Sequence, residues 1–169
     1  VASWIAGQND KVELFRQGLD EYKSFASSAL YGVPYDEVTK EMRQVSKSAV
    51  LGCMFGQGAK GLVEYADGMG VKLTMQQSEK AVKAYRAAYE RVKSSWYDFE
   101  GACVSAIKDP NKAYRVGKVA FKVQNNVLWM QLPSGRVICW QRPEVEDQLT
   151  PWGAKKLGVT VFKIGRAHV

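Results

Sequence analysis

The chain has 169 residues, of which 46% are hydrophobic, 24% charged and 11% aromatic, which fits one globular domain and excludes an intrinsically disordered chain. No apolar run approaches the roughly 18 residues of a membrane span, and the wide spacing of three cysteines and one histidine excludes a disulfide scaffold and a recognisable zinc motif. The 24 basic against 17 acidic residues give a net charge of +7, which slightly favours a polyanionic partner.

Three short helices are predicted over residues 1–7, 10–18 and 20–32, because apolar residues recur at helical spacing in each. Asp10 and Asp20 are the expected N-caps of the second and third helices, and a glycine ends each of the three. The first helix begins without an initiator methionine, a cap or a turn, so we expect the sequence to be a fragment of a longer protein.

A longer helix is predicted over residues 39–55, and a short one over 62–66. Thr74 starts a helical stretch that should stop at Pro110, which cannot continue a helix. An apolar seam runs along this stretch at spacings of three and four residues, formed by Val82, Tyr85, Tyr89, Val92 and Trp96. The tyrosines and Trp96 could form a base-stacking platform, but the spacing favours core packing. Cys53, on the apolar side of the 39–55 helix, is interpreted as a small core residue.

After Pro110 the apolar period changes from helical to two, which predicts strands. A strand is expected around 119–123, a hairpin turns at Leu132-Pro133-Ser134-Gly135, and 158–162 is strand-like. The predicted fold class is therefore α+β, with a mainly helical region over 1–110 followed by a small antiparallel β-hairpin or sheet over 111–162. The tail 163–169 (KIGRAHV) resembles the translation of a sequencing adapter, the alternative being a genuine basic tail.

The best candidate site is a row of four residues at intervals of four along the 39–55 helix: Arg43, Lys47, Leu51 and Phe55. Two cations one turn apart can bind successive phosphates, and the apolar side chains on the next turns offer a surface for a base or sugar. This order of charges and apolar groups suits a nucleotide. From spacing alone, an amphipathic helix with a solvated basic edge is the favoured alternative.

The segment RQVSKSAVLGCMFG is similar to the fingers-helix motif of family A DNA polymerases, the bacterial DNA polymerase I type. VASWIAGQ resembles the stretch after that family's first catalytic motif, and GLDEYKSFAS and YGVPYDEVTKEMR resemble the segments that join this motif to the fingers helix. LWMQLPSGRVICWQRP resembles the hairpin region of phage-encoded members. The resemblance covers residues 1–162 and implies that the helical region is the fingers subdomain and that 111–162 lies at the palm edge.

The resemblance implies that Arg43 and Lys47 bind the triphosphate of the incoming deoxynucleotide. It also implies a catalytic role for Lys47, which would help to protonate the pyrophosphate leaving group.

Leu51 stands where the family usually has Phe or Tyr against the incoming sugar and base, so the resemblance leaves the tightness of sugar discrimination in doubt. Phe55 replaces the usual Tyr beside the templating base and keeps the ring. Gly56 completes the motif. Tyr22 falls near a nucleotide-contacting His of many bacterial members and is a weaker candidate for nucleotide binding.

The reaction of this family uses two Mg²⁺ ions, whose carboxylate motifs are expected before Val1 and beyond Phe162, so no metal ligand is expected in this sequence and the fragment alone is expected to be inactive. The acidic run Glu144, Glu146 and Asp147 could suggest a metal site, but a solvated acidic loop is favoured. A second group of charges lies around the predicted hairpin and consists of Lys112, Arg115, Lys118, Lys122 and Arg136. These cations either touch duplex phosphates or act as ordinary solubilising charge.

The resemblance thus implies a DNA-directed DNA polymerase acting in DNA replication as the intact parent, cytoplasmic in a bacterial or phage-infected host. Its partners would be a DNA primer-template and dNTPs, with no membrane. The alternative is a non-catalytic helical nucleic-acid-binding module. In that case a start and a stop codon should lie near the two ends of the sequence.

Overall fold

The computed structural model describes residues 1–149 and 155–162, with the side chains of 155, 161 and 162 left aside. The expected adapter-like tail at 163–169 lies outside the described residues. The chain divides into two compact units, Val1–Ser94 and a second that begins at Ser95. The domain boundary that we predict at residue 110 stays a prediction.

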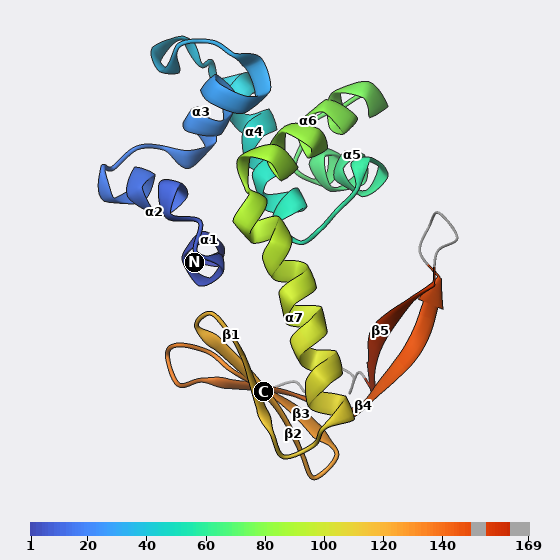
Figure 1. Cartoon of the computed structure of the whole chain (residues 1–169). Coiled ribbons are helices and arrows are strands. Elements are labelled where there is room, and N and C mark those ends of the chain that lie inside the picture. The colour runs from blue at the N-terminus through green and yellow to red at the C-terminus, as the bar shows by residue number, and fades with distance from the viewer. Residues whose placement is uncertain (150–154, 163–169) are drawn as a thin grey trace. The chain divides into compact units, whose positions relative to one another are not determined.

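The first unit is helical. Its elements are α1 Ala2–Ala6, α2 Asn9–Arg16, α3 Glu21–Phe25, the π-helical turn η1 Ala26–Tyr31, the 3-10 turn η2 Tyr35–Glu37, α4 Lys40–Met54, α5 Ala59–Gly68 and α6 Met75–Ala88. Helix α4 packs against α3, η1, α5 and α6, as Figure 1 shows. The expected helices of this region are thereby confirmed, with η1 extending α3 as far as Gly32, whose φ of 70° allows the chain to turn.

The capping predictions are only partly confirmed. The Asp20 carboxylate accepts hydrogen bonds from the backbone N–H groups of Tyr22 and Lys23 at the start of α3. The expectation that Asp10 caps the second helix is wrong, because Gln8 holds the N-cap position and Asp10 lies in the first turn of α2. An acidic residue in the first turn of a helix also interacts favourably with the helix dipole. The presence of Asp10 near the start of α2 therefore did not distinguish a first-turn residue from an N-cap.

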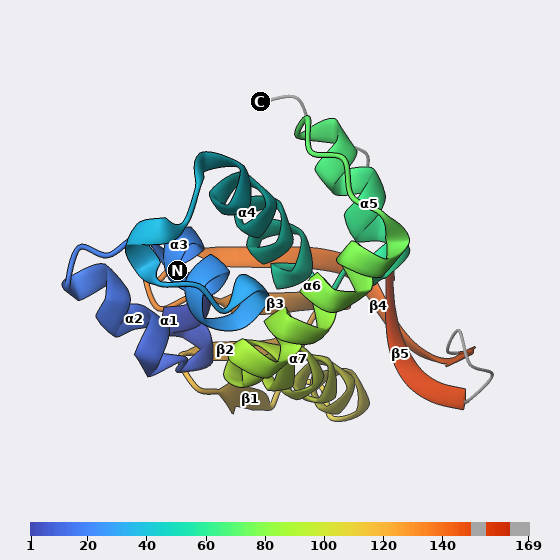
Figure 2. The ribbon, with the colours of Figure 1, turned by 90° about the horizontal axis from the view of Figure 1, so that it is seen from above.

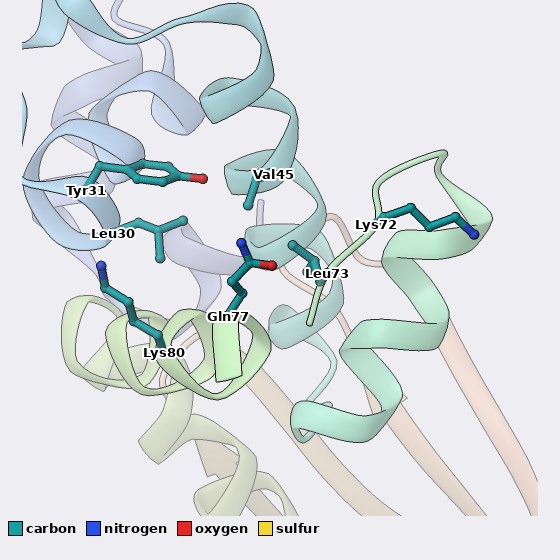
Figure 3. A pocket seen from close by; sticks show the side chains of 7 residues that line it. All are labelled: Leu30, Tyr31, Val45, Lys72, Leu73, Gln77 and Lys80. Carbon is teal, nitrogen blue, oxygen red and sulfur yellow. The ribbon is translucent and has the colours of Figure 1, made fainter. Parts of the chain in front are cut away.

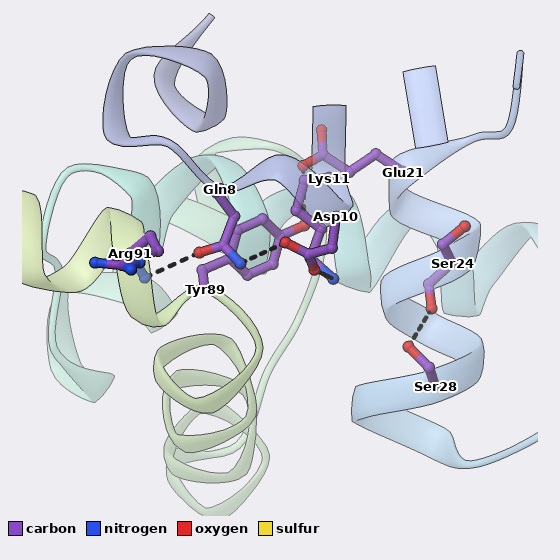
Figure 4. Close-up of polar contacts among 8 residues, drawn as sticks. All are labelled: Gln8, Asp10, Lys11, Glu21, Ser24, Ser28, Tyr89 and Arg91. Carbon is purple, nitrogen blue, oxygen red and sulfur yellow. Dashed lines mark hydrogen bonds and ion pairs between the residues drawn. The ribbon is translucent and has the colours of Figure 1, made fainter. Parts of the chain in front are cut away.

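The expected stretch from Thr74 to Pro110 consists of two helices, α6 and α7 Glu90–Lys108. They are separated at Tyr89, whose φ of −127° and ψ of 48° are not helical. The amide of Gln8 is central to this break, because its carbonyl oxygen accepts a hydrogen bond from the Arg91 backbone N–H at 2.9 Å. Tyr89 donates its hydroxyl proton to Glu21, also at 2.9 Å, and Figure 4 shows these contacts together.

The core of the first unit confirms core packing for Tyr85 and Tyr89 of the aromatic seam, whereas for Trp96, which is half-buried in the second unit, it stays a prediction. The Tyr85 and Tyr89 rings stack with centroids 4.4 Å apart, and Phe25 meets both rings at 6.0–6.4 Å. All three side chains are buried, so they are not available to stack on a base.

The second unit contains a five-stranded antiparallel sheet in the order β1-β2-β3-β4-β5. Its strands are β1 Ala113–Val116, β2 Val119–Gln124, β3 Val127–Gln131, β4 Val137–Leu149 and β5 Lys155–Phe162. Figure 2 shows β1 to β4 side by side and β5 beside the distal part of β4. The predicted hairpin turn is confirmed, since Gly135 has a φ of 84° and donates its N–H to the Leu132 carbonyl at 2.9 Å.

One face of this sheet carries Phe121, Val123 and Leu128, which are buried, and Phe121 meets Phe99 of α7 with ring centroids 5.9 Å apart. The acidic residues Glu144 and Glu146 lie on strand β4 and not on the expected loop. They are exposed there, because a strand with one solvated face accepts polar residues at alternate positions.

Candidate functional site

Helix α4 carries the predicted row of site residues. Thr39 accepts a hydrogen bond from the Met42 backbone N–H at 3.2 Å and so begins the helix where the sequence predicted. One side of α4 is buried and contains Ala49, Val50 and Cys53, which confirms the core assignment of Cys53. With that side fixed in the core, Arg43, Lys47 and Leu51 stand one turn apart on an adjacent, half-buried side.

Arg43 is held by a carboxylate from α3. Its Nε and Nη2 both lie 2.7 Å from Oδ2 of Asp20, and the Tyr22 ring centroid lies 5.3 Å from its guanidinium carbon. The structure therefore brings two predicted site residues, Arg43 and Tyr22, together. Sequence reasoning assigned Asp20 only to a helix cap, because nothing in the spacing connects it to a residue 23 positions later.

The electrostatics of this cluster follow from its contacts. Partial burial acts to raise the pKa of Asp20, but the hydrogen bond from the Lys23 backbone and the charge and hydrogen bond of Arg43 outweigh it, so this pKa lies below its ordinary value. Burial, together with the charge of Glu21, raises the pKa of Tyr22. At neutral pH the cluster is thus an ionised Asp20–Arg43 pair beside a neutral phenol.

Lys47 lies one turn beyond Arg43 and is half-buried. Within residues 1–149 and 155–162 it makes no ion pair, in contrast to Arg43. Its ammonium group therefore keeps its capacity to bind an anion.

The apolar end of the row is less regular than predicted. Leu51 is half-buried in α4, but the helix ends at Met54 and Phe55 is the C-cap residue. The Phe55 side chain is 82% exposed, an unusual state for a large aromatic ring. Gly56 follows with a φ of 78°, which only glycine adopts without strain, and turns the chain away from the helix.

The opposite side of α4 borders a cavity of about 230 Å³, shown in Figure 3. Its lining residues are Leu30, Tyr31, Val45, Lys72, Leu73, Gln77 and Lys80. Val45 comes two positions after Arg43, which at 100° per residue places it on the other side of the helix. The predicted row and this cavity are therefore separate features.

The remaining candidates are distributed over the second unit. Lys112 forms an ion pair with Asp109 at 3.5 Å, which fits a solubilising charge. Lys122 and Arg115 lie on the sheet. Among the described residues, no three His, Cys, Asp or Glu side chains gather in one place. No described helix is long and apolar enough to cross a membrane.

Residues 1–107, more than half of the chain, match the family model of DNA polymerase family A. The chain belongs to DNA polymerase family A. It is 30% identical over 148 residues to a protein named DNA polymerase from Bacillus phage SP02, which covers 86% of this chain. It is also 33% identical over 90 residues to DNA polymerase I of Aquifex aeolicus, which covers 48% of it.

These matches cover only 22% of the phage SP02 protein and 16% of the Aquifex protein. The family A chain thus spans a small part of the length of the curated relatives it matches. The match to the family model includes the whole of α4 and the segment that carries Asp20 and Tyr22.

Proposed function

We propose that α4 binds the triphosphate of an incoming deoxynucleoside triphosphate during template-directed DNA synthesis in replication. The observation that carries this proposal is the pair of cations one turn apart on α4, one held by Asp20 and the other without an ion pair among the described residues. Membership of DNA polymerase family A supports the same assignment, since relatives of this chain are named DNA polymerase.

In the proposed reaction the primer hydroxyl oxygen attacks the α-phosphorus and loses its proton to solvent water, and the bond to pyrophosphate breaks. Arg43 binds a phosphate through the N–H groups that Asp20 leaves open, because a guanidinium carries five donors. Lys47 binds the adjoining phosphates and gives a proton to the departing pyrophosphate as a general acid. Closure of the helix over the nucleotide would bring these groups to the reacting atoms.

The apolar residues would contact the nucleoside. We assign Leu51 to the sugar and base of the incoming nucleotide and Phe55 to the templating base, against which its exposed ring can stack. Gly56 frees this ring by turning the chain, and Tyr22 supports the Arg43 guanidinium with its ring face.

The family also suggests a divalent metal, Mg²⁺, in the intact polymerase, where it would stabilise charge on the phosphates. The described residues do not form a ligand set for such an ion, and the proposal assigns no step to a metal held by them.

The proposal is tested by replacing Lys47 with alanine in the 169-residue chain and measuring dTTP binding by isothermal titration calorimetry. Loss of one charge-assisted contact, at about 1.5–3 kcal/mol, should weaken binding by at least about tenfold. The matched control is Lys83→Ala on α6, an exposed lysine away from α4, which should bind dTTP like the parent. Unchanged dTTP affinity in the Lys47 variant would contradict the proposal.

A second measurement separates the polymerase proposal from a nucleic-acid-binding module. In a polymerase that carries this sequence, Lys47→Ala should lower the single-turnover rate of nucleotide incorporation steeply and leave primer-template affinity nearly unchanged. A module that binds nucleic acid through α4 would instead lose affinity for the primer-template.

A further inference from the structure

Part of one face of the second unit's sheet is exposed or half-buried. Strand pairing aligns Ala113, Lys122, Trp129 and Cys139 in one row across β1 to β4, and Arg115, Ala120, Gln131 and Val137 in the next. Paired residues point to the same side of an antiparallel sheet, so these eight form one surface, which we call the open face. The buried Phe121, Val123 and Leu128 alternate with them and lie on the other side.

The open face combines an exposed aromatic ring with a shallow hollow. Trp129, on a strand with a neighbour on each side, is 40% exposed, and Val137, at the start of β4, is 51% exposed. A hollow of about 260 Å³ is lined by six residues of the open face and by Phe121: Ala113, Ala120, Phe121, Lys122, Trp129, Gln131 and Val137. The hollow is bordered by the indole of Trp129, against which a flat ring system can stack.

The charges of the open face have one sign. Lys122 stands directly opposite Trp129 in the register, and Arg115 lies diagonally from Lys122 on the neighbouring strand. Neither cation pairs with a carboxylate among the described residues, and none of the eight residues is acidic. A polyanion with flat, apolar groups is the partner that matches this composition.

We propose that the open face binds single-stranded DNA, with one unpaired base stacked on Trp129 and the neighbouring phosphates on Lys122 and Arg115. Stacking on an exposed aromatic ring requires a base that is not covered by its neighbours in a duplex, which selects the single strand. A second copy of this chain fits less well, because a two-fold interface would set the same cations against each other. The site is separate from the α4 row and does not depend on the proposed nucleotide binding.

The test uses the 169-residue chain and a fluorescein-labelled 12-mer of oligo(dT), with binding followed by fluorescence anisotropy. Trp129→Ala should bind this strand at least about fivefold more weakly, and Trp129→Phe should recover most of the affinity, since stacking needs only a ring. Lys122→Gln should reduce the slope of log affinity against log salt by about 0.7, the value for one phosphate contact to a single strand.

The controls replace the same residue types at other locations, and the two tryptophans are also similarly exposed. Trp4→Ala replaces a tryptophan that is 45% exposed in the first unit, and Lys83→Gln removes an exposed lysine on α6, so both should bind the 12-mer like the parent. Circular dichroism on each variant verifies folding. An unchanged affinity in Trp129→Ala overturns the proposal. So does sedimentation of the parent as a dimer that becomes monomeric in Trp129→Ala, because the face would then serve self-association.

Discussion

Asp20 joins two elements through a single carboxylate, since Oδ1 accepts the backbone N–H groups of Tyr22 and Lys23 and Oδ2 accepts from Arg43. Its pKa is lower in the folded chain than in the unfolded one. The stability from this group is therefore fully present above the ordinary pKa of an aspartate and is lost as the pH falls through the folded-state value.

We expect Asp20→Asn to cost about 0.5–1 kcal/mol at pH 7, a small value because both side chains of the ion pair are partly exposed. Asparagine can still cap helix α3, so the lost stability measures the contribution of the Asp20 charge. Urea unfolding at pH 7 and at pH 3 should show a difference from the parent that shrinks at the lower pH. Asp36→Asn, at an exposed position, serves as the control. A difference that stays constant with pH would contradict this account.

Residue patterns predicted the row on α4 but not the partner of Arg43. The intervals of four along 43–55 are a local property and need only the helical repeat. The Asp20–Arg43 pair needs the tertiary approach of α3 to α4, which no local pattern contains. The same holds for Gln8, which reaches the Arg91 backbone 83 positions away.

At the scale of the elements, the contact between α4 and α5 depends on a glycine. A Cβ added to Gly52 would lie 2.8 Å from Oε1 of Gln57 and 2.9 Å from Cδ1 of the buried Leu62. Gly52→Ala should therefore destabilise the chain by about 1–3 kcal/mol through overpacking. Thermal unfolding followed by circular dichroism measures this as a lower midpoint.

Gly61→Ala on α5 is the matched control, because its nearest atom would be Cγ of Gln57 at 3.8 Å, an ordinary contact. Alanine favours a helix over glycine by up to about 1 kcal/mol, so this variant should raise the unfolding midpoint. A raised midpoint in both variants would mean that helix propensity, and not the close approach of α5, controls the effect.

Helices and strands whose apolar residues follow a regular period were predicted from the sequence. The break between α6 and α7 was not predicted. Tyr85, Tyr89 and Val92 keep helical spacing through the break, so the pattern is continuous where the backbone is not. The non-helical backbone at Tyr89 accompanies two tertiary hydrogen bonds, from Arg91 to Gln8 and from Tyr89 to Glu21. Tertiary contacts of this kind override local propensity.

At the scale of the whole molecule, the net charge of +7 suited a polyanionic partner but did not say where it binds. The structure offers cations without ion pairs among its described residues in both compact units, Lys47 in the first and Lys122 in the second. The proposed ligands differ accordingly, a triphosphate for α4 and a single strand for the open face.

This division leads to a prediction for the double variant Lys47→Ala with Trp129→Ala. Because the two residues belong to different compact units and share no partner among the described contacts, their effects should add within about 0.5 kcal/mol. Binding of dTTP should match the Lys47 variant alone, and binding of the oligo(dT) 12-mer should match the Trp129 variant alone. Calorimetry and anisotropy on the four proteins of this cycle supply both numbers. Strong coupling in either assay would mean that one ligand contacts both residues, and the assignment of separate ligands to α4 and the open face would then be wrong.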